Sequence, residues 1–101
     1  MSQQSTSTVI KETLHVDVPR MYDVYILNDD FTPMDFVVHL LVEVFGKSTA
    51  DAFQIMMSVH NSDRGKVGTY SYDMARSKVN KATRLARSEG HPLRLTFEPQ
   101  N

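Results

Sequence analysis

The chain has 101 residues, of which 41% are hydrophobic and 23% charged, with a formal net charge of -1 and no cysteine. This length suits one domain with one modest core. The charge argues against broad nucleic-acid binding, which needs a surplus of Lys and Arg facing the phosphates. The lack of cysteine excludes disulfides, a thiolate nucleophile and zinc–thiolate sites. No stretch reaches transmembrane length and no secretory signal is recognisable, so we expect a cytoplasmic protein without membrane contact.

The first 20 residues differ in composition from the remainder of the chain. They are rich in Ser, Thr and Gln and hold too few apolar side chains to build a core, so residues 1–20 are predicted to form a flexible arm. Such an arm is either an inert leader or a tether that acts on a partner. The folded domain is predicted to span residues 21–101.

Apolar spacing predicts six elements in this domain, in the order βααβαβ. The predicted segments are a strand over residues 22–27, helices over about 33–45 and 48–60, a strand over 66–70, a helix over about 71–90 and a strand over 93–97. Gly46 supplies a stop for the first helix, and the polar residues 61–65 predict a turn after the second. The order favours an α+β fold, in which three helices pack on a small three-stranded antiparallel sheet.

The joint between the first strand and the first helix concentrates an amide and two carboxylates. Thr32 suits an N-cap, Pro33 suits the first helical position, and Asp35 completes a capping box. These assignments leave Asn28, Asp29 and Asp30 without a structural role.

His60 ends the second predicted helix, where the helix macrodipole alone favours a histidine. If the first two helices form an antiparallel hairpin, however, His60 lies beside the joint. Apolar side chains would then line a hollow of roughly one side chain in volume next to an acidic, hydrogen-bonding rim. They are Met34, Val37, Met56 and Val59.

This combination suits a positively charged amine attached to a hydrophobic group, and a free peptide N-terminus is such a ligand. Its α-amino group has a pKa of about 7.7–8.0, so near neutral pH it is largely an ammonium with three protons to donate. Asn, Asp and an unprotonated His can accept them. Burial of a Leu or Phe side chain in the hollow contributes roughly 1.5–3 kcal/mol.

The third predicted helix has two contrasting faces. Small residues form its inner stripe, and five cations lie on its exposed side: Arg76, Lys78, Lys81, Arg84 and Arg87. These cations are either a solvated face or a docking surface for an acidic partner.

Three sequence blocks resemble the ClpS family, the adaptors that recognise N-degrons for the ClpA-type AAA+ unfoldase of a Clp protease. The blocks are Tyr22-x-Val24-x-Ile26-Leu27-Asn28-Asp29-Asp30-Phe31-Thr32-Pro33-Met34-Asp35-Phe36-Val37, Met56-x-x-Val59-His60 and His91-Pro92-Leu93. The resemblance covers residues 21 to 101. It implies a non-enzymatic, monomeric protein without cofactor, whose partners are N-degron peptides and a ClpA-type unfoldase with its ClpP protease.

The resemblance also implies roles for individual residues. The α-amino group of the substrate would be held by Asn28, Asp30 and His60, with Asp29 beside them. The side-chain pocket would be formed by Thr32, Met34, Val37, Met56, Val59 and Leu93. Met34 would exclude β-branched first residues, which implies Leu, Phe, Tyr and Trp as ligands. Unfoldase docking would involve Asp73 and Lys78, and the N-terminal arm would take part in handing over the substrate.

Two other functions remain as alternatives at this point. A metal-dependent hydrolase could use Asp29, Asp30 and His60 as ligands, since carboxylate and imidazole are suitable ligand types. A passive interaction domain could use the basic third helix as its contact surface. The second alternative leaves the acidic joint and the methionine pair unexplained.

Overall fold

The computed structural model describes residues 19–101, so the predicted arm lies almost entirely outside the described residues. The elements are β1 (Met21–Leu27), α2 (Met34–Phe45), α3 (Thr49–Asn61), β2 (Arg64–Ser71), α4 (Tyr72–Ser88) and β3 (Arg94–Pro99). The predicted βααβαβ order is confirmed. Within residues 19–101, none of the helices combines the length and the apolar character that crossing a lipid bilayer requires.

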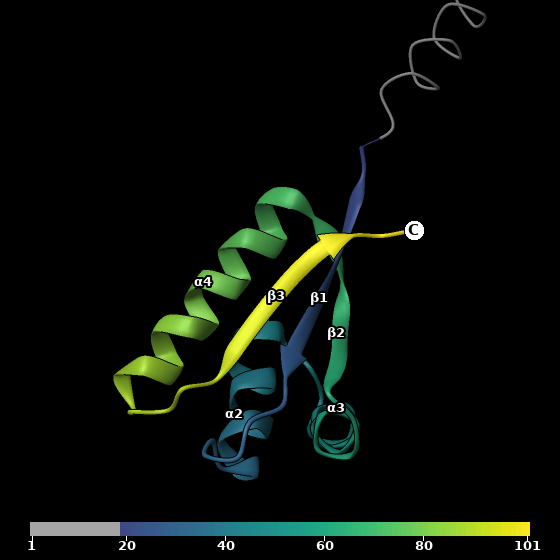
Figure 1. Cartoon of the computed structure of the whole chain (residues 1–101). Helices are drawn as coiled ribbons and strands as arrows, with labels where there is room; N and C mark the ends of the chain where they lie inside the picture. The colour runs from purple at the N-terminus through teal and green to yellow at the C-terminus, as the bar shows by residue number, and fades with distance from the viewer. Residues whose placement is uncertain (1–18) are drawn as a thin grey trace, which may run out of the picture.

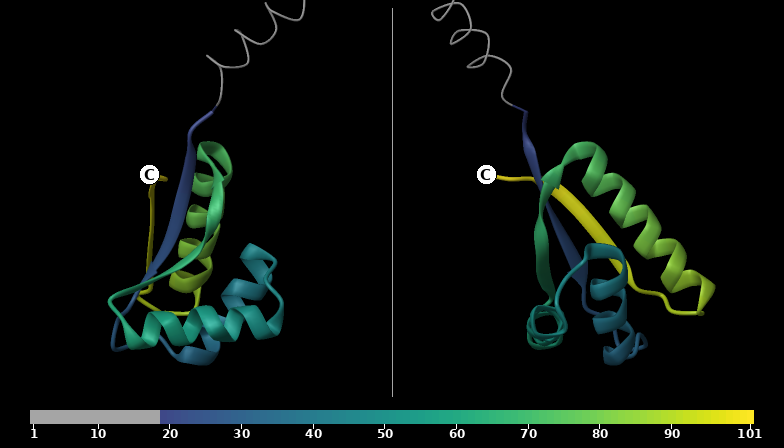
Figure 2. Two further views of the ribbon diagram at one scale, coloured as in Figure 1. Left: turned by 90° about the vertical axis from the view of Figure 1, so that its right-hand side faces the viewer. Right: turned by 180° about the vertical axis from the view of Figure 1, so that it is seen from behind.

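The three strands form one antiparallel sheet with β1 in the centre, in the order β2-β1-β3. The inward residues of β1, Val24 and Ile26, are completely buried, as the alternation predicts. Figures 1 and 2 show the helices on one side of this sheet, with α4 running along the strands. The structure is therefore the predicted α+β fold.

Helix α4 covers the sheet with small side chains. Ala75, Ala82 and Ala86 are completely buried and Val79 nearly so, and the helix contacts all three strands. Alanines at this spacing allow a helix axis to approach a sheet closely. Helix α2 fills the space between α3 and α4, where Leu40 and Leu41 are inaccessible to solvent.

The turn between α3 and β2 is shorter than the polar residues 61–65 predicted. Asn61 ends α3 and Arg64 already begins β2. Gly65, expected in the turn, is a buried strand residue. A Cβ atom there would lie 2.6 Å from Val59 Cγ2 and 3.1 Å from the Val59 backbone nitrogen. Gly65 is thus needed for close packing of α3 against β2, rather than for a turn.

Candidate functional site

The joint between β1 and α2 is held by the carboxylate of Asp29. Asp29 Oδ1 accepts hydrogen bonds from the backbone nitrogens of Phe31 (2.8 Å) and Thr32 (2.7 Å), and Oδ2 accepts one from the Thr32 hydroxyl (2.9 Å). Burial raises the pKa of Asp29, but these hydrogen bonds and the charge of Arg94 together lower it below its usual value. The joint is therefore a turn that depends on an ionised Asp29.

The predicted capping box at the start of α2 is wrong. Pro33 occupies the N-cap without a side-chain hydrogen bond, and the Thr32 hydroxyl is engaged with Asp29 instead. The Asp35 carboxylate accepts from the adjacent backbone nitrogen of Phe36 at 2.9 Å. The physical reason is that both Thr32 donors are engaged by the Asp29 carboxylate, so the Thr32 backbone nitrogen is not left for a capping box with Asp35.

A second tie places this joint beside the end of α3. The backbone nitrogen of Asn28 donates to the carbonyl oxygen of Asp63, two residues after α3 ends, at 2.9 Å. The first two helices do not form the antiparallel hairpin that the sequence argument considered: Figure 1 shows α3 end-on where α2 is seen from the side. The helices cross, yet His60 still reaches the joint, since the tie to Asp63 brings the two chain segments together.

The third wall of the site precedes β3. Leu93 is 1% exposed, and the Arg87 guanidinium donates to the carbonyl oxygens of His91 (2.9 Å) and Leu93 (2.7 Å). These bonds fix the chain between α4 and β3. The side chain of Leu93 is thereby held in place at the base of the site.

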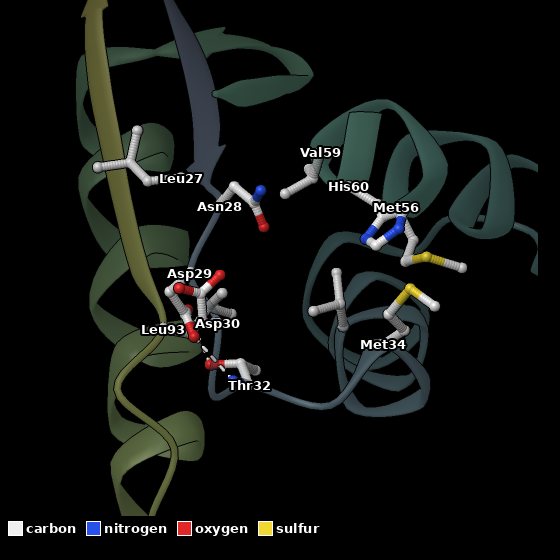
Figure 3. A pocket seen from close by; sticks show the side chains of 11 residues that line it. Leu27, Asn28, Asp29, Asp30, Thr32, Met34, Met56, Val59, His60 and Leu93 are labelled. Carbon is white, nitrogen blue, oxygen red and sulfur yellow. Dashed lines mark hydrogen bonds between the residues drawn. The ribbon is translucent and has the colours of Figure 1, made fainter. Parts of the chain in front are cut away.

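These segments enclose a pocket of about 470 Å³, a volume within the range of small-ligand sites. It is lined by Leu27, Asn28, Asp29, Asp30, Thr32, Met34, Val37, Met56, Val59, His60 and Leu93. The structure thus brings together all ten residues predicted to bind a substrate. Figure 3 shows the residues of the joint facing His60, Met56 and Met34 across the hollow.

Leu27 is the lining residue that sequence reasoning missed. It ends β1 and lies on the face of the strand away from the core, half-buried. Its position directly before Asn28 in the sequence could have indicated this role. A residue at the end of a strand lies close to the side chains of the joint that follows the strand.

The pocket has a buried apolar wall and an exposed polar rim. Val37, Met56 and Val59 are each 5% exposed, whereas Asn28, Asp30 and His60 are all exposed. Across residues 19–101, no hydrogen bond engages the side chains of these three rim residues. The rim can therefore accept hydrogen bonds from a ligand without first breaking any bond that the described part of the chain makes.

The metal-site alternative does not fit this geometry. Among the described residues, no group of three His, Cys, Asp or Glu side chains is arranged to hold a metal ion. Asp29, one of the three proposed ligands, uses both of its carboxylate oxygens within the turn.

The two predicted docking residues lie away from this pocket. Asp73 is exposed in the first turn of α4. Lys78 is half-buried, and its ammonium donates to the carbonyl oxygen of Val44 near the end of α2 at 3.2 Å. Asp73 is thus available to a partner, whereas Lys78 is engaged in holding α2 against α4.

An α+β fold with a pocket that is polar at its rim and apolar at its base is typical of a small ligand-binding domain. A model of the family described as ATP-dependent Clp protease adaptor protein ClpS matches residues 17–96. The chain belongs to the ClpS family. Its relatives are named as adaptors rather than enzymes, and the family serves the Clp protease machinery.

The individual relatives cover most of the chain. An ATP-dependent Clp protease adapter protein ClpS from Acetivibrio thermocellus is 46% identical over 98 residues, which are 95% of this chain and 99% of the relative. One from Deinococcus radiodurans is 46% identical over 82% of this chain and 74% of its own length. The structure of Agrobacterium tumefaciens ClpS2 bound to L-phenylalaninamide is similar with a TM-score of 0.80 and 37% identity, covering 82% of this chain and all of that one (100%).

Proposed function

We propose that this adaptor binds the free N-terminus of proteins whose first residue is Leu, Phe, Tyr or Trp. It then delivers them to a ClpA-type AAA+ unfoldase for degradation by the Clp protease. The observation that carries the proposal is the pocket itself. Exposed polar side chains without hydrogen bonds among the described residues stand at the edge of a buried apolar wall. An N-terminal residue of this kind presents the matching pair of groups, an ammonium and a large apolar side chain.

The rim would bind the ammonium group. Its three N–H donors match the Asn28 Oδ1, the Asp30 carboxylate and an unprotonated nitrogen of His60. Asp29 has a different role in this proposal, because its oxygens already accept three hydrogen bonds within the turn. It positions Asn28 and Asp30 rather than contacting the substrate, and its negative charge adds to the attraction of the rim for a cation.

The first side chain of the substrate would occupy the apolar part of the pocket. L-Phenylalaninamide, the ligand of the Agrobacterium protein, carries a free α-amino group and a benzyl side chain, which supports this type of ligand. Met34 is 45% exposed at the mouth. A β-branched residue is widest next to its α-carbon, so it would meet Met34 at the mouth, whereas Leu and Phe are narrow there.

Delivery requires that the substrate and the unfoldase are held at the same time. The pocket lies at the Leu27 end of β1, whereas Met21, at the other end of the strand, pairs with Ser71, which precedes α4. Asp73 therefore lies at the end of the sheet remote from the pocket. A partner that docks at the start of α4 would leave the pocket open.

Fluorescence anisotropy with a labelled peptide that begins with Phe, compared with its N-acetylated twin, tests the proposal. Acetylation removes the charge and two donors, so the acetylated peptide should not bind. In the bound state the ammonium pair is desolvated, so Asp30→Ala should weaken binding by about two to three decades, the cost of 3–5 kcal/mol typical of breaking a buried ion pair. Asp73→Ala removes the same charge far from the pocket and should bind normally. Equal binding of the two peptides refutes the proposal.

A further inference from the structure

Two arginines flank Leu27 on the face of the sheet that the helices leave uncovered. Leu27 ends β1 and lines the pocket, and it pairs with Arg64 of β2 on one side and with Arg94 of β3 on the other. Residues directly opposite each other in an antiparallel sheet present their side chains on the same face, with Cβ atoms about 4.5–5.5 Å apart. Both arginine side chains therefore begin next to a residue of the pocket.

The two arginines differ in what their side chains contact. The Arg64 guanidinium lies 3.8 Å from the centroid of the Tyr25 ring and 3.3 Å from a carboxylate oxygen of Glu98. Arg94 is exposed. Within residues 19–101, its side chain takes part in none of the hydrogen bonds, ion pairs or cation–π contacts. Arg94 is thus available to a ligand, whereas Arg64 is already engaged.

A structural role does not account for Arg94. Strand β3 is paired with β1 from Tyr22 to Leu27, and the Arg87 guanidinium holds the carbonyl oxygen of Leu93 at 2.7 Å. The Arg94 side chain adds no contact to these within the described part of the chain, so its replacement should leave the fold unchanged.

The charges at the rim leave a role for this cation. Asp29 and Asp30 place two carboxylates at the joint, and the ammonium of a bound N-terminus balances one of them. Burial raises the pKa of Asp29, while its hydrogen bonds and the charge of Arg94 lower it, so Arg94 lies within electrostatic reach of the joint. Without Arg94, the occupied rim would keep a net negative charge and would repel a carboxylate of the substrate.

We propose that Arg94 is a specificity-determining residue, which allows the substrate to carry Asp or Glu directly after its first residue. The inference rests on the proposed function. Consecutive Cα atoms are about 3.8 Å apart, so the second residue lies at the rim when the first occupies the pocket. Charges there interact over roughly 8 Å at physiological ionic strength. An arginine suits this role, since its long side chain carries a permanent charge and five donors.

Peptides that begin with Phe and differ only in their second residue test this role by fluorescence anisotropy with the full-length protein. Glu and Gln are similar in shape, so the ratio of their Kd values isolates the effect of the charge. We expect Arg94→Gln to raise the ratio of Kd for Phe-Glu to Kd for Phe-Gln about two- to fivefold, the range for exposed charge pairs. Phe-Lys should bind the variant at least as tightly as the wild type, because a repelling charge has been removed.

Two variants serve as matched controls. Arg94→Lys keeps the charge and should keep the ratio of the wild type. Arg84→Gln removes the same charge from α4, outside the pocket lining, and should also leave the ratio unchanged. The effect of Arg94→Gln should shrink as salt is added, since the charges at the rim are exposed to solvent.

The outcomes separate this inference from the function on which it rests. Failure of the wild type to bind the Phe-Gln peptide refutes the proposed function. If the wild type binds it and Arg94→Gln leaves the ratio unchanged, the role of Arg94 alone is overturned. Equal losses for all three peptides also overturn it, because they indicate a structural role. A change of the same size in Arg84→Gln overturns it as well, because it indicates an effect of net charge.

Discussion

Substitution of Gly65 by Ala links the packing of α3 directly to the pocket. The added Cβ would lie 2.6 Å from Val59 Cγ2, 3.1 Å from the Val59 nitrogen and 3.3 Å from the carbonyl oxygen of Ile55. Carbon atoms prefer about 3.5–4.0 Å, so the Val59 side chain must turn away from the new Cβ atom. The other two atoms belong to the helix backbone, so α3 must in addition move away from β2 by a few tenths of an ångström.

The cost follows from two opposing contributions. Overpacking of a buried site costs typically about 1–3 kcal/mol, while replacement of Gly by Ala recovers about 0.4–1 kcal/mol through the unfolded state. We expect a net loss of roughly 1–2 kcal/mol, equivalent to about 4–16 °C in Tm for a domain of this size. Because Val59 and His60 both lie on α3 and line the pocket, binding of the Phe peptide should also weaken at least several-fold. Displacement of the Val59 side chain and of α3 disturbs a site whose groups must be held within about 0.5 Å.

Urea unfolding and peptide anisotropy on the same variants measure both effects. Gly68→Ala is the matched control in the same strand, since the three atoms nearest its new Cβ belong to the side chain of Tyr70 and none of them to the backbone. Val59→Ala removes Cγ2, so the double variant with Gly65→Ala should be more stable than the sum of the single changes, by about 0.5–3 kcal/mol. A Gly65→Ala protein with wild-type stability and peptide affinity would contradict the reasoning.

Three further outcomes are expected. The folded-state pKa of Asp29 is lowered, so its contribution to stability is complete above the unfolded pKa of about 3.9 and is lost as pH falls through the lower folded value. In urea titrations at pH 7 and pH 3, Asp29→Asn should therefore lose less stability on acidification than the wild type does. An equal loss in the two proteins would contradict this. Lys78→Met removes the donor to Val44 O and should lower the free energy of unfolding by about 1 kcal/mol while peptide affinity stays unchanged; weaker peptide binding would show that Lys78 acts on the pocket. Met34→Ala opens the pocket mouth and should allow peptides that begin with Ile or Val to bind in the anisotropy assay, whereas continued rejection would place the selectivity elsewhere.

The sequence predicted helix caps well where the cap is local and poorly where a charge competes. Ser48 and Asp51 have the spacing of a capping box, and the Ser48 hydroxyl accepts from the Asp51 nitrogen at 3.1 Å. Thr32 matched the same pattern at α2, but Asp29 captures both its backbone and its hydroxyl donors. The sequence pattern shows that a cap is possible, but it does not show that a neighbouring carboxylate competes for the same donors.

The residues of the pocket could be predicted because they lie at ends of elements that a small antiparallel sheet must bring together. The crossing of α2 and α3 could not be predicted, because apolar spacing shows which face of a helix is buried but not the angle at which two helices meet. The start of β2 was misplaced for a related reason. Glycine is a residue type common in turns, and only the close approach of Gly65 to Val59 shows why glycine is required in this strand.

The hydrogen bonds that fix the pocket walls favour the proposed binding of a single terminal residue. Each wall is fixed by a hydrogen bond outside the regular elements: Asp29 holds the joint, Asn28 N ties it to Asp63 O, and Arg87 holds Leu93. Binding of a ligand therefore carries a small entropic cost for ordering these walls, so more of the interaction free energy contributes to affinity. Met34 is the exception, since it is half-exposed at the mouth and has three rotatable side-chain bonds. Discrimination among Leu, Phe, Tyr and Trp should then depend on how Met34 adjusts, whereas recognition of the ammonium depends on a rim that does not need to move.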